Sequence, residues 1–223
     1  MIKRTSTSAF WESENKQRGT EYQWGGLSPA KFAHIISQHC SKQDKLLILV
    51  CGAGMSKDAL SLQKVFKHAN VLAVDFTRES VEYQKSLGVT SLQVDLLRYN
   101  KEWKGKFDVV IDASFTDVFT SDWKDNDNAQ YNKQSLRALA NILRYVKQNG
   151  GLFVVNTIVQ TDDEFRDYVS MATKNKLIYN PQTVMKASDI DDKNRTRVNR
   201  WGRVVKGMGS SNGHVGFWTL GLD

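Results

Sequence analysis

The chain of 223 residues is 40% hydrophobic and has only two prolines, a composition that excludes disordered and fibrous proteins. No apolar run approaches the ~20 residues of a membrane helix, and the amino-terminal residues lack the apolar core of a secretory signal. Two cysteines and four scattered histidines give neither metal-ligand spacing nor a disulfide framework. We therefore expect one cytoplasmic domain over 1–223, without a bound metal and without membrane contact.

The net charge of +7 comes mainly from one segment. Residues 193–206 hold six basic residues and no acidic one, with Trp201 among them. Such a segment favours a large anionic partner over a small metabolite. A charged loop that only contacts solvent is the simpler interpretation, and the sequence leaves both open.

Helical periodicity and apolar runs alternate from residue 29 onward. The pattern predicts helices over 29–40, 57–69, 78–88, 133–148 and 162–173. It predicts strands over 45–51, 70–76, 90–96, 107–113, 152–158, 176–180 and 214–220. Continuous apolar strands separated by helices are typical of a parallel sheet covered on both faces, so the fold class is α/β. The connection over 181–213 contains the basic segment and is too long for a simple turn, which indicates a functional loop.

The first predicted strand runs into a turn of small residues, Cys51-Gly52-Ala53-Gly54. In open parallel sheets, ligands bind at the carboxyl ends of strands where the strand order reverses. A dinucleotide fingerprint needs a third glycine where Lys57 stands, which weakens the interpretation as an NAD-dependent dehydrogenase without removing it. The Walker loop of nucleotide triphosphatases is absent.

Three aspartates, Asp75, Asp95 and Asp112, end three successive predicted strands. The first is placed to accept hydrogen bonds from ribose hydroxyls, the second from an adenine amine, and the third lies near the reacting centre. Together with the glycine turn they outline a nucleoside joined to an amino acid, without a pyrophosphate. That is the shape of S-adenosylmethionine. The simpler alternative is that each aspartate caps the helix that follows it.

Residues 10–158 resemble the class I S-adenosylmethionine-dependent methyltransferases. Two segments are similar, more narrowly, to the group that includes eukaryotic elongation-factor lysine methyltransferases. "FWESENKQRGTEYQWGG" (10–26) resembles that group's "YW…RY…FEWY" segment, and "FDVVIDASFTDVF" (107–119) resembles its "FDVVIDKGTLDAL". Ile48 and Val50 replace the acid and first glycine that class I enzymes commonly have, and Ala113 and Ser114 replace the group's lysine and glycine.

The resemblance implies a Rossmann-like, seven-stranded, mostly parallel sheet with helices on both faces and an antiparallel last strand. It also implies that segment 1–28 covers the cofactor and the acceptor channel. We expect S-adenosylmethionine to contact the turn, the strand ends and this segment: Cys51, Gly52, Ala53, Gly54, Asp75, Phe76, Asp95, Leu96, Asp112 and Trp24. The acceptor proton needs a base, for which the candidates are Asp112, Asp117 and Tyr22.

The expected acceptor is a macromolecule. Protein lysine comes first because of the two resembling segments, and RNA is the alternative because of the basic 193–206 segment. In either case the acceptor would contact an aromatic and basic set: Trp11, Arg195, Arg197, Arg200, Trp201 and Arg203. A rival hypothesis is a cofactor-binding scaffold with weak catalysis that partners another subunit.

Overall fold

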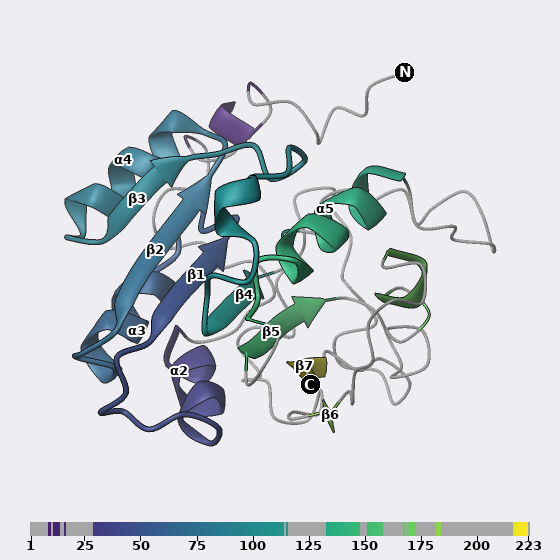
Figure 1. Ribbon diagram of the computed structural model, residues 1–223. Helices are drawn as coiled ribbons and strands as arrows, with labels where there is room; N and C mark the ends of the chain where they lie inside the picture. Colours follow the sequence, from purple (N-terminus) through teal and green to yellow (C-terminus); the bar gives the residue numbers. More distant parts are fainter. Residues whose placement is uncertain are drawn as a thin grey trace, which may run out of the picture.

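The computed structural model describes residues 29–113, 115, 133–147, 151–157, 169–172, 182–183 and 216–222, with 9, 11–13, 16 and 167. Within these residues one seven-stranded sheet has the strand order β3-β2-β1-β4-β5-β7-β6 (Figure 1). The strands are β1 (Leu47–Cys51), β2 (Asn70–Asp75), β3 (Thr90–Gln93), β4 (Val109–Ala113), β5 (Gly151–Thr157), β6 (Gln182–Thr183) and β7 (Gly216–Leu222).

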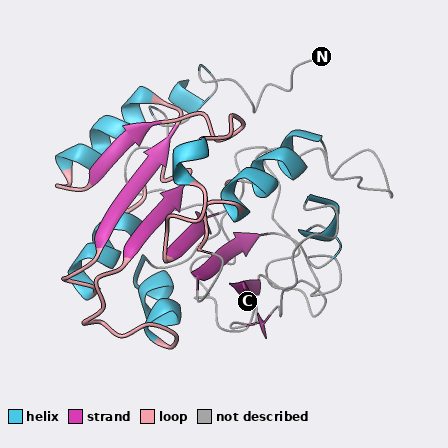
Figure 2. Cartoon of the chain, viewed as in Figure 1, coloured by secondary structure: helices cyan, strands magenta, loops and turns pink. Residues whose placement is uncertain are grey.

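The first five strands are parallel to one another, and β7 is antiparallel to both β5 and β6. Helices connect the parallel strands, as the colouring of Figure 2 shows. They are α2 (Pro29–Ser37), α3 (Asp58–Val65), α4 (Arg78–Ser86) and α5 (Lys133–Leu143), with the short 3₁₀ helix η4 (Lys101–Trp103) before β4. The predicted α/β, Rossmann-like, mostly parallel sheet is therefore confirmed.

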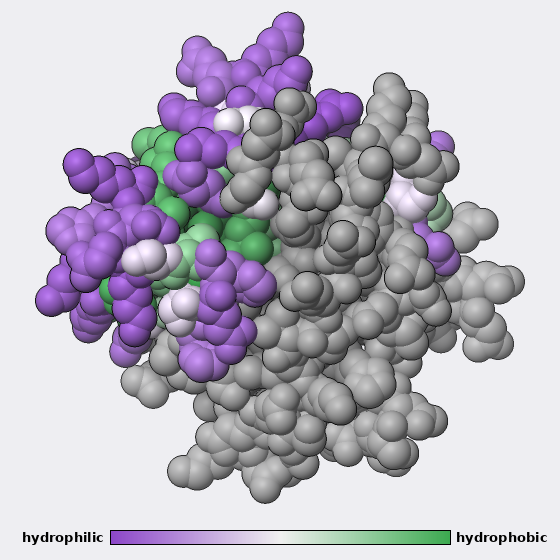
Figure 3. Space-filling model, turned by 60° about the horizontal axis from the view of Figure 1, so that its bottom comes forward, coloured by the Kyte–Doolittle hydropathy of each residue, from purple (hydrophilic) through white to green (hydrophobic). Residues whose placement is uncertain are grey.

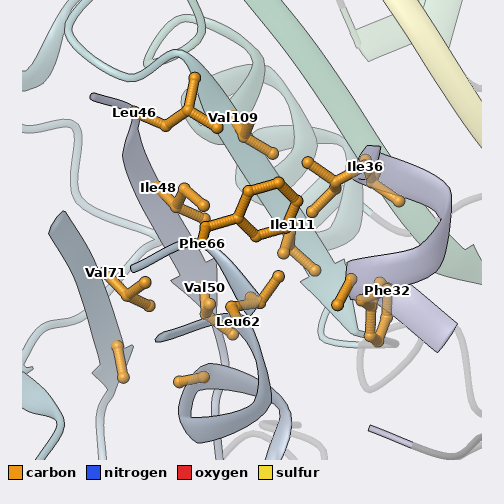
Figure 4. Packing of buried hydrophobic residues seen from close by; sticks show 14 of the residues in the cluster. Phe32, Ile36, Leu46, Ile48, Val50, Leu62, Phe66, Val71, Val109 and Ile111 are labelled. Carbon is orange, nitrogen blue, oxygen red and sulfur yellow. The ribbon is translucent and has the colours of Figure 1, made fainter. Parts of the chain in front are cut away.

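Alternation along β1 explains why its apolar run is continuous. Ile48 and Val50 face the layer that holds α2 and α3, while Leu49 and Cys51 face the layer that holds α5. Figure 4 shows the first layer, in which Phe66 lies among apolar side chains of the strands. Because both faces of the strand are buried, every position along it needs an apolar side chain.

On the face of the sheet that holds α5, the connection between β3 and β4 contains the short η4 and no long helix. Trp103 packs edge-on against Phe107 and Tyr145, with ring centroids 5.7 and 5.5 Å away. The Tyr145 hydroxyl accepts a hydrogen bond from the Asn100 backbone N–H at 2.9 Å. Three aromatic rings thus fill the layer that a helix would otherwise occupy.

Two predicted elements have different bounds in the structure. Helix α5 ends at Leu143, short of the predicted 148, because the Phe107 N–H donates to the Tyr145 carbonyl and draws the chain into a bridge. Strand β6 pairs with β7 at 182–183, beyond the predicted 176–180, which lie outside the described residues. The connection between the last two strands consequently begins at 184. No helix in the described part of the chain has the length and apolarity to cross a membrane.

Candidate functional site

The strand order reverses between β1 and β4, which are neighbours although β2 and β3 separate them in the chain. After β1 the chain turns toward β2, and the next strand on the other side is β4. Crevices at such reversals, outside the carboxyl ends of the strands, are where open α/β sheets bind ligands. The residues that border this one are the turn over 52–57 and Phe115, just beyond β4.

The turn after β1 depends on two glycines with left-handed backbone conformations. Gly52 has φ of 61° and Gly54 has φ of 53°. A Cβ at Gly52 would come within 2.7 Å of the Phe115 Cβ, whereas the nearest atom to a Cβ at Gly54 would be 3.8 Å away. Gly52 is therefore required by both its φ and the Phe115 side chain, and Gly54 by its φ alone.

Asp75, the last residue of β2, ties this turn to the start of α4. Its Oδ2 accepts from the Gly54 N–H at 2.9 Å, and its Oδ1 accepts from the Thr77 N–H at 2.9 Å and the Thr77 hydroxyl at 2.8 Å. The side chain is buried, with 8% of its surface exposed. Burial raises the pKa of the carboxyl, and the hydrogen bonds from Thr77, Gly54 and Phe76 partly offset that rise.

The other two predicted aspartates also hold their own turns. Asp95 lies two residues beyond β3, is exposed, and accepts from the Leu97 N–H at 3.0 Å. Asp112 lies within β4, is fully buried, and accepts from the Phe115 N–H at 2.7 Å. All three carboxylates thus shape the loops at the carboxyl ends of the strands. Their assignment to parts of a nucleoside stays a prediction.

Two residues of this site escaped the sequence analysis. Gln84, fully buried on α4, donates its Nε2 to the carbonyls of Gly54 at 3.0 Å and Ser56 at 2.9 Å, while its Oε1 has no hydrogen-bond partner. Asp58 begins α3 directly after the turn, and burial raises the pKa of its carboxyl to about 6. A carboxyl that immediately follows a glycine turn was a usable signal for Asp58. No local signal marks Gln84, which reaches the turn from 30 residues away.

The remaining predicted cofactor residues divide by burial. Cys51 and Ala53 are buried, and the Ala53 N–H donates to the Val74 carbonyl, so they supply backbone to the turn. Burial raises the pKa of the Cys51 thiol well above its usual value, which makes it unsuited to act as a nucleophile. Leu96 is buried in the apolar layer beside α5, while Phe76 is partly exposed at the strand ends.

The predicted substrate and base residues are largely beyond the described part of the chain. Trp11 is half-buried in a short helical turn, which Figure 1 draws toward the end of the sheet to which the β1 and β2 arrowheads point. No cluster of metal-ligating side chains occurs among the described residues. The predicted residues that lie outside them are Tyr22, Trp24, Asp117, Arg195, Arg197, Arg200, Trp201 and Arg203.

No protein-family model matches the sequence, and no curated protein matches it. Solved structures match over most of its length. One is the 1,6-didemethyltoxoflavin-N1-methyltransferase of Burkholderia thailandensis, with 1,6-didemethyltoxoflavin and S-adenosylhomocysteine bound. It is 14% identical with a TM-score of 0.60, over 96% of this chain and 85% of that chain.

Two further structures match at similar levels. A TehB-like S-adenosylmethionine-dependent methyltransferase from Corynebacterium glutamicum is 15% identical with a TM-score of 0.57, over 97% of this chain and all of that chain. The plantazolicin methyltransferase in complex with S-adenosylhomocysteine is 12% identical with a TM-score of 0.57, over 99% and 95%. The chain therefore has the class I methyltransferase fold. Likeness to the elongation-factor lysine methyltransferases stays a prediction.

Proposed function

We propose that this protein is an S-adenosylmethionine-dependent methyltransferase whose donor binds at the carboxyl ends of β1, β2 and β4. The observation that carries the proposal is the turn at the strand-order reversal, where Gly52 and Gly54 both have positive φ. Without side chains, these residues let a ligand approach the backbone closely. The fold and the ligands bound in similar structures support the choice of donor.

The residues present fit such a donor. Phe115 occupies the space beside Gly52, whereas a Cβ at Gly54 would lie 3.8 Å from its nearest neighbour, so the backbone at Gly54 is the part of the turn with room for a slender amino-acid chain. No phosphate-binding loop is present, as expected for a ligand without a pyrophosphate. When bound, S-adenosylmethionine supplies a methyl group activated by its sulfonium.

The chain's own residues hold this site in shape. Asp75 accepts a hydrogen bond from the Gly54 N–H, and Gln84 donates to the Gly54 and Ser56 carbonyls. Both the N–H and the carbonyl groups of the turn are therefore held by side chains. Phe115 places apolar atoms directly beside Gly52. Alignment of donor and acceptor is the main requirement of an in-line methyl transfer.

The proposed acceptor is a macromolecule, with protein lysine favoured by the resemblance of segments 10–26 and 107–119. RNA is the second candidate, favoured by the charge of segment 193–206. The test adds radiolabelled donor to purified protein and a cell extract, then treats half of the product with ribonuclease and half with protease. Label lost with protease indicates a protein acceptor, and label lost with ribonuclease indicates RNA. Absence of label despite donor binding would favour the scaffold hypothesis.

Donor binding itself is tested by titration calorimetry with S-adenosylhomocysteine. Asp75→Ala should weaken binding more than about tenfold, because the Gly54 and Thr77 donors lose their acceptor and the turn relaxes. Thr77→Val is the matched control, since it removes one hydrogen bond to Asp75 and keeps the carboxylate. Equal affinity of the Asp75→Ala and parent proteins would reject this site.

A further inference from the structure

The connections that lead into the parallel strands carry exposed basic side chains. Lys67 precedes β2, Lys45 precedes β1, Lys106 precedes β4, and Arg144 follows α5 on the way to β5. Three more exposed lysines stand on the same connections or at their helix ends: Lys42, Lys64 and Lys104. We call these seven residues the basic edge.

Backbone hydrogen bonds hold these connections next to one another. The Asn70 N–H donates to the Leu46 carbonyl, which joins the entries of β2 and β1. The Asp108 N–H donates to the Leu47 carbonyl, and the Gly105 N–H donates to the Arg144 carbonyl. The four strands are adjacent in the order β2-β1-β4-β5, and strands lie ~4.8 Å apart. The entries of these four strands therefore span about 15 Å, and the basic connections lead into this row of entries.

These connections carry fewer acidic than basic side chains. Asp108 is paired with Lys147, which is not one of the seven, and the exposed acidic residues include Asp44 before β1 and Glu102 before β4. Within the described part of the chain, no ion pair engages Lys45, Lys67 or Lys106. Figure 3, in which the lower side of Figure 1 comes forward, shows hydrophilic side chains around the described part of this face, with hydrophobic side chains between them.

Helix C-termini explain part of the pattern but not all of it. Lys64 lies in the last turn of α3, where a cation favourably meets the helix dipole. Lys45 lies eight residues after α2, and Lys106 lies three residues after the short η4, so neither stands in the last turn of an α-helix. The helix dipole therefore does not account for these two lysines.

The chemistry of the row favours a phosphate backbone over a folded protein partner. Protein interfaces need buried apolar or aromatic anchors. The large apolar side chains most exposed among the described residues, Leu92 and Met171, lie within β3 and in the 169–172 helical turn, away from these connections. Arg144 already stacks over the Tyr99 ring at 5.4 Å. Point charges on adjacent connections match one strand of phosphates, the form in which RNA is commonly recognised.

We propose that the basic edge binds the phosphate backbone of single-stranded RNA. This surface lies at the opposite end of the strands from the glycine turn, so binding here goes beyond the proposed function and holds for a protein or an RNA acceptor. The basic edge shares no residue with segment 193–206, whose charge favours the RNA alternative.

The test measures binding of a fluorescent 20-nucleotide single-stranded RNA at several salt concentrations, without donor. The edge variant carries Lys45→Gln, Lys67→Gln and Lys106→Gln. Its affinity should fall on the order of tenfold, and the slope of log K against log salt should decrease by about 2, since each phosphate contact to a single strand contributes about 0.7. The matched control carries Arg78→Gln, Lys133→Gln and Arg137→Gln, which remove the same charge from exposed positions on α4 and α5.

The control variant should keep the parent's affinity and slope within about threefold and 0.7 respectively. An equal loss in both variants would mean that only net charge matters and would reject the basic edge. Parent-like binding by the edge variant would reject it too. Tighter binding of duplex DNA, or equal binding of poly-glutamate, would overturn the assignment to RNA. Circular dichroism and thermal unfolding check that both variants fold.

Discussion

At the carboxyl ends of β2 and β4, acidic side chains are buried, whereas at the amino ends of the parallel strands basic side chains are exposed. Asp75 and Asp112 are buried and accept hydrogen bonds from the loops that they hold. Lys45 and Lys67 are exposed and engage no ion pair in the described residues. The first end is held by hydrogen bonds to buried carboxylates, and the second presents exposed positive charge. Substitutions should therefore disturb shape at one end and long-range attraction at the other.

The layer between the two ends should respond differently from either. Phe66 is fully buried beneath β1 and packs against the sheet with Leu62 and Ile48. Phe66→Ala should lower the free energy of unfolding by about 3–5 kcal/mol, because it leaves a cavity as well as losing apolar burial. Urea denaturation measures this. While the variant stays folded, its affinities for S-adenosylhomocysteine and RNA should match those of the parent. If only one of the two affinities fell, the core would contribute to binding at that end of the strands.

The carboxyl end should show a pH-dependent stability that arises at Asp58. The pKa of Asp58 is raised from 3.8 to about 6, so between these values the folded state keeps a proton that the unfolded state has released. Stability therefore falls as pH rises through this window, by about 3 kcal/mol at roughly 1.4 kcal/mol per pKa unit. Asp58→Asn should remove this fall. The difference in unfolding free energy between parent and variant, measured from pH 4 to 7.5, isolates the contribution of Asp58. A difference that stays constant over this range would contradict the burial of this carboxyl.

Substitutions at the two glycines of the turn should distinguish the cost of backbone strain from the cost of a steric clash. Alanine at either position adopts a left-handed conformation, which costs about 1–2 kcal/mol. Alanine at Gly52 also meets Phe115, which should add about 1–3 kcal/mol of overpacking. Gly52→Ala should therefore be less stable than Gly54→Ala in parallel denaturation curves. Adding Phe115→Ala to Gly52→Ala should recover much of the difference, and no recovery would mean that Phe115 does not constrain the turn.

The smallest effect is expected at the basic edge. Lys45→Gln removes an exposed charge without an ion pair, so the free energy of unfolding should change by less than about 0.5 kcal/mol. Its effect on RNA binding should nevertheless be measurable at low salt and vanish at high salt. A larger change in thermal stability would show that this lysine has a structural role.

Sequence patterns predicted the strands and their class because burial on both faces demands continuous apolar runs. The runs over 45–51 and 70–76 became β1 and β2 with small changes at the ends. Sequence patterns predicted the bounds of a strand less well where strand pairing, and not burial, determines them. Only two residues of β6 pair with β7, and the pairing register places them at Gln182 and Thr183, beyond the apolar run that predicted the strand.

The candidate site was predicted in outline. The glycine turn and the strand-end position of Asp75 followed from local order in the chain. The local order did not predict which side chains meet at the turn, because Gln84 and Phe115 come from distant segments and reach it through tertiary contacts. The inward hydrogen bonds of Asp75 depend on the conformation of its own turn, which no composition or period encodes.

Strand β7 has a consequence for how the chain is made. It pairs with β5 along seven residues, from Gly151 with Leu222 to Thr157 with Gly216, yet roughly 60 residues separate the two strands. At about 5–20 residues per second, synthesis leaves the edge of β5 without this partner for several seconds. An apolar strand with an open edge is a template for pairing with other chains. The nascent chain is therefore most exposed to misassembly after its five parallel strands are complete and before its last segment emerges.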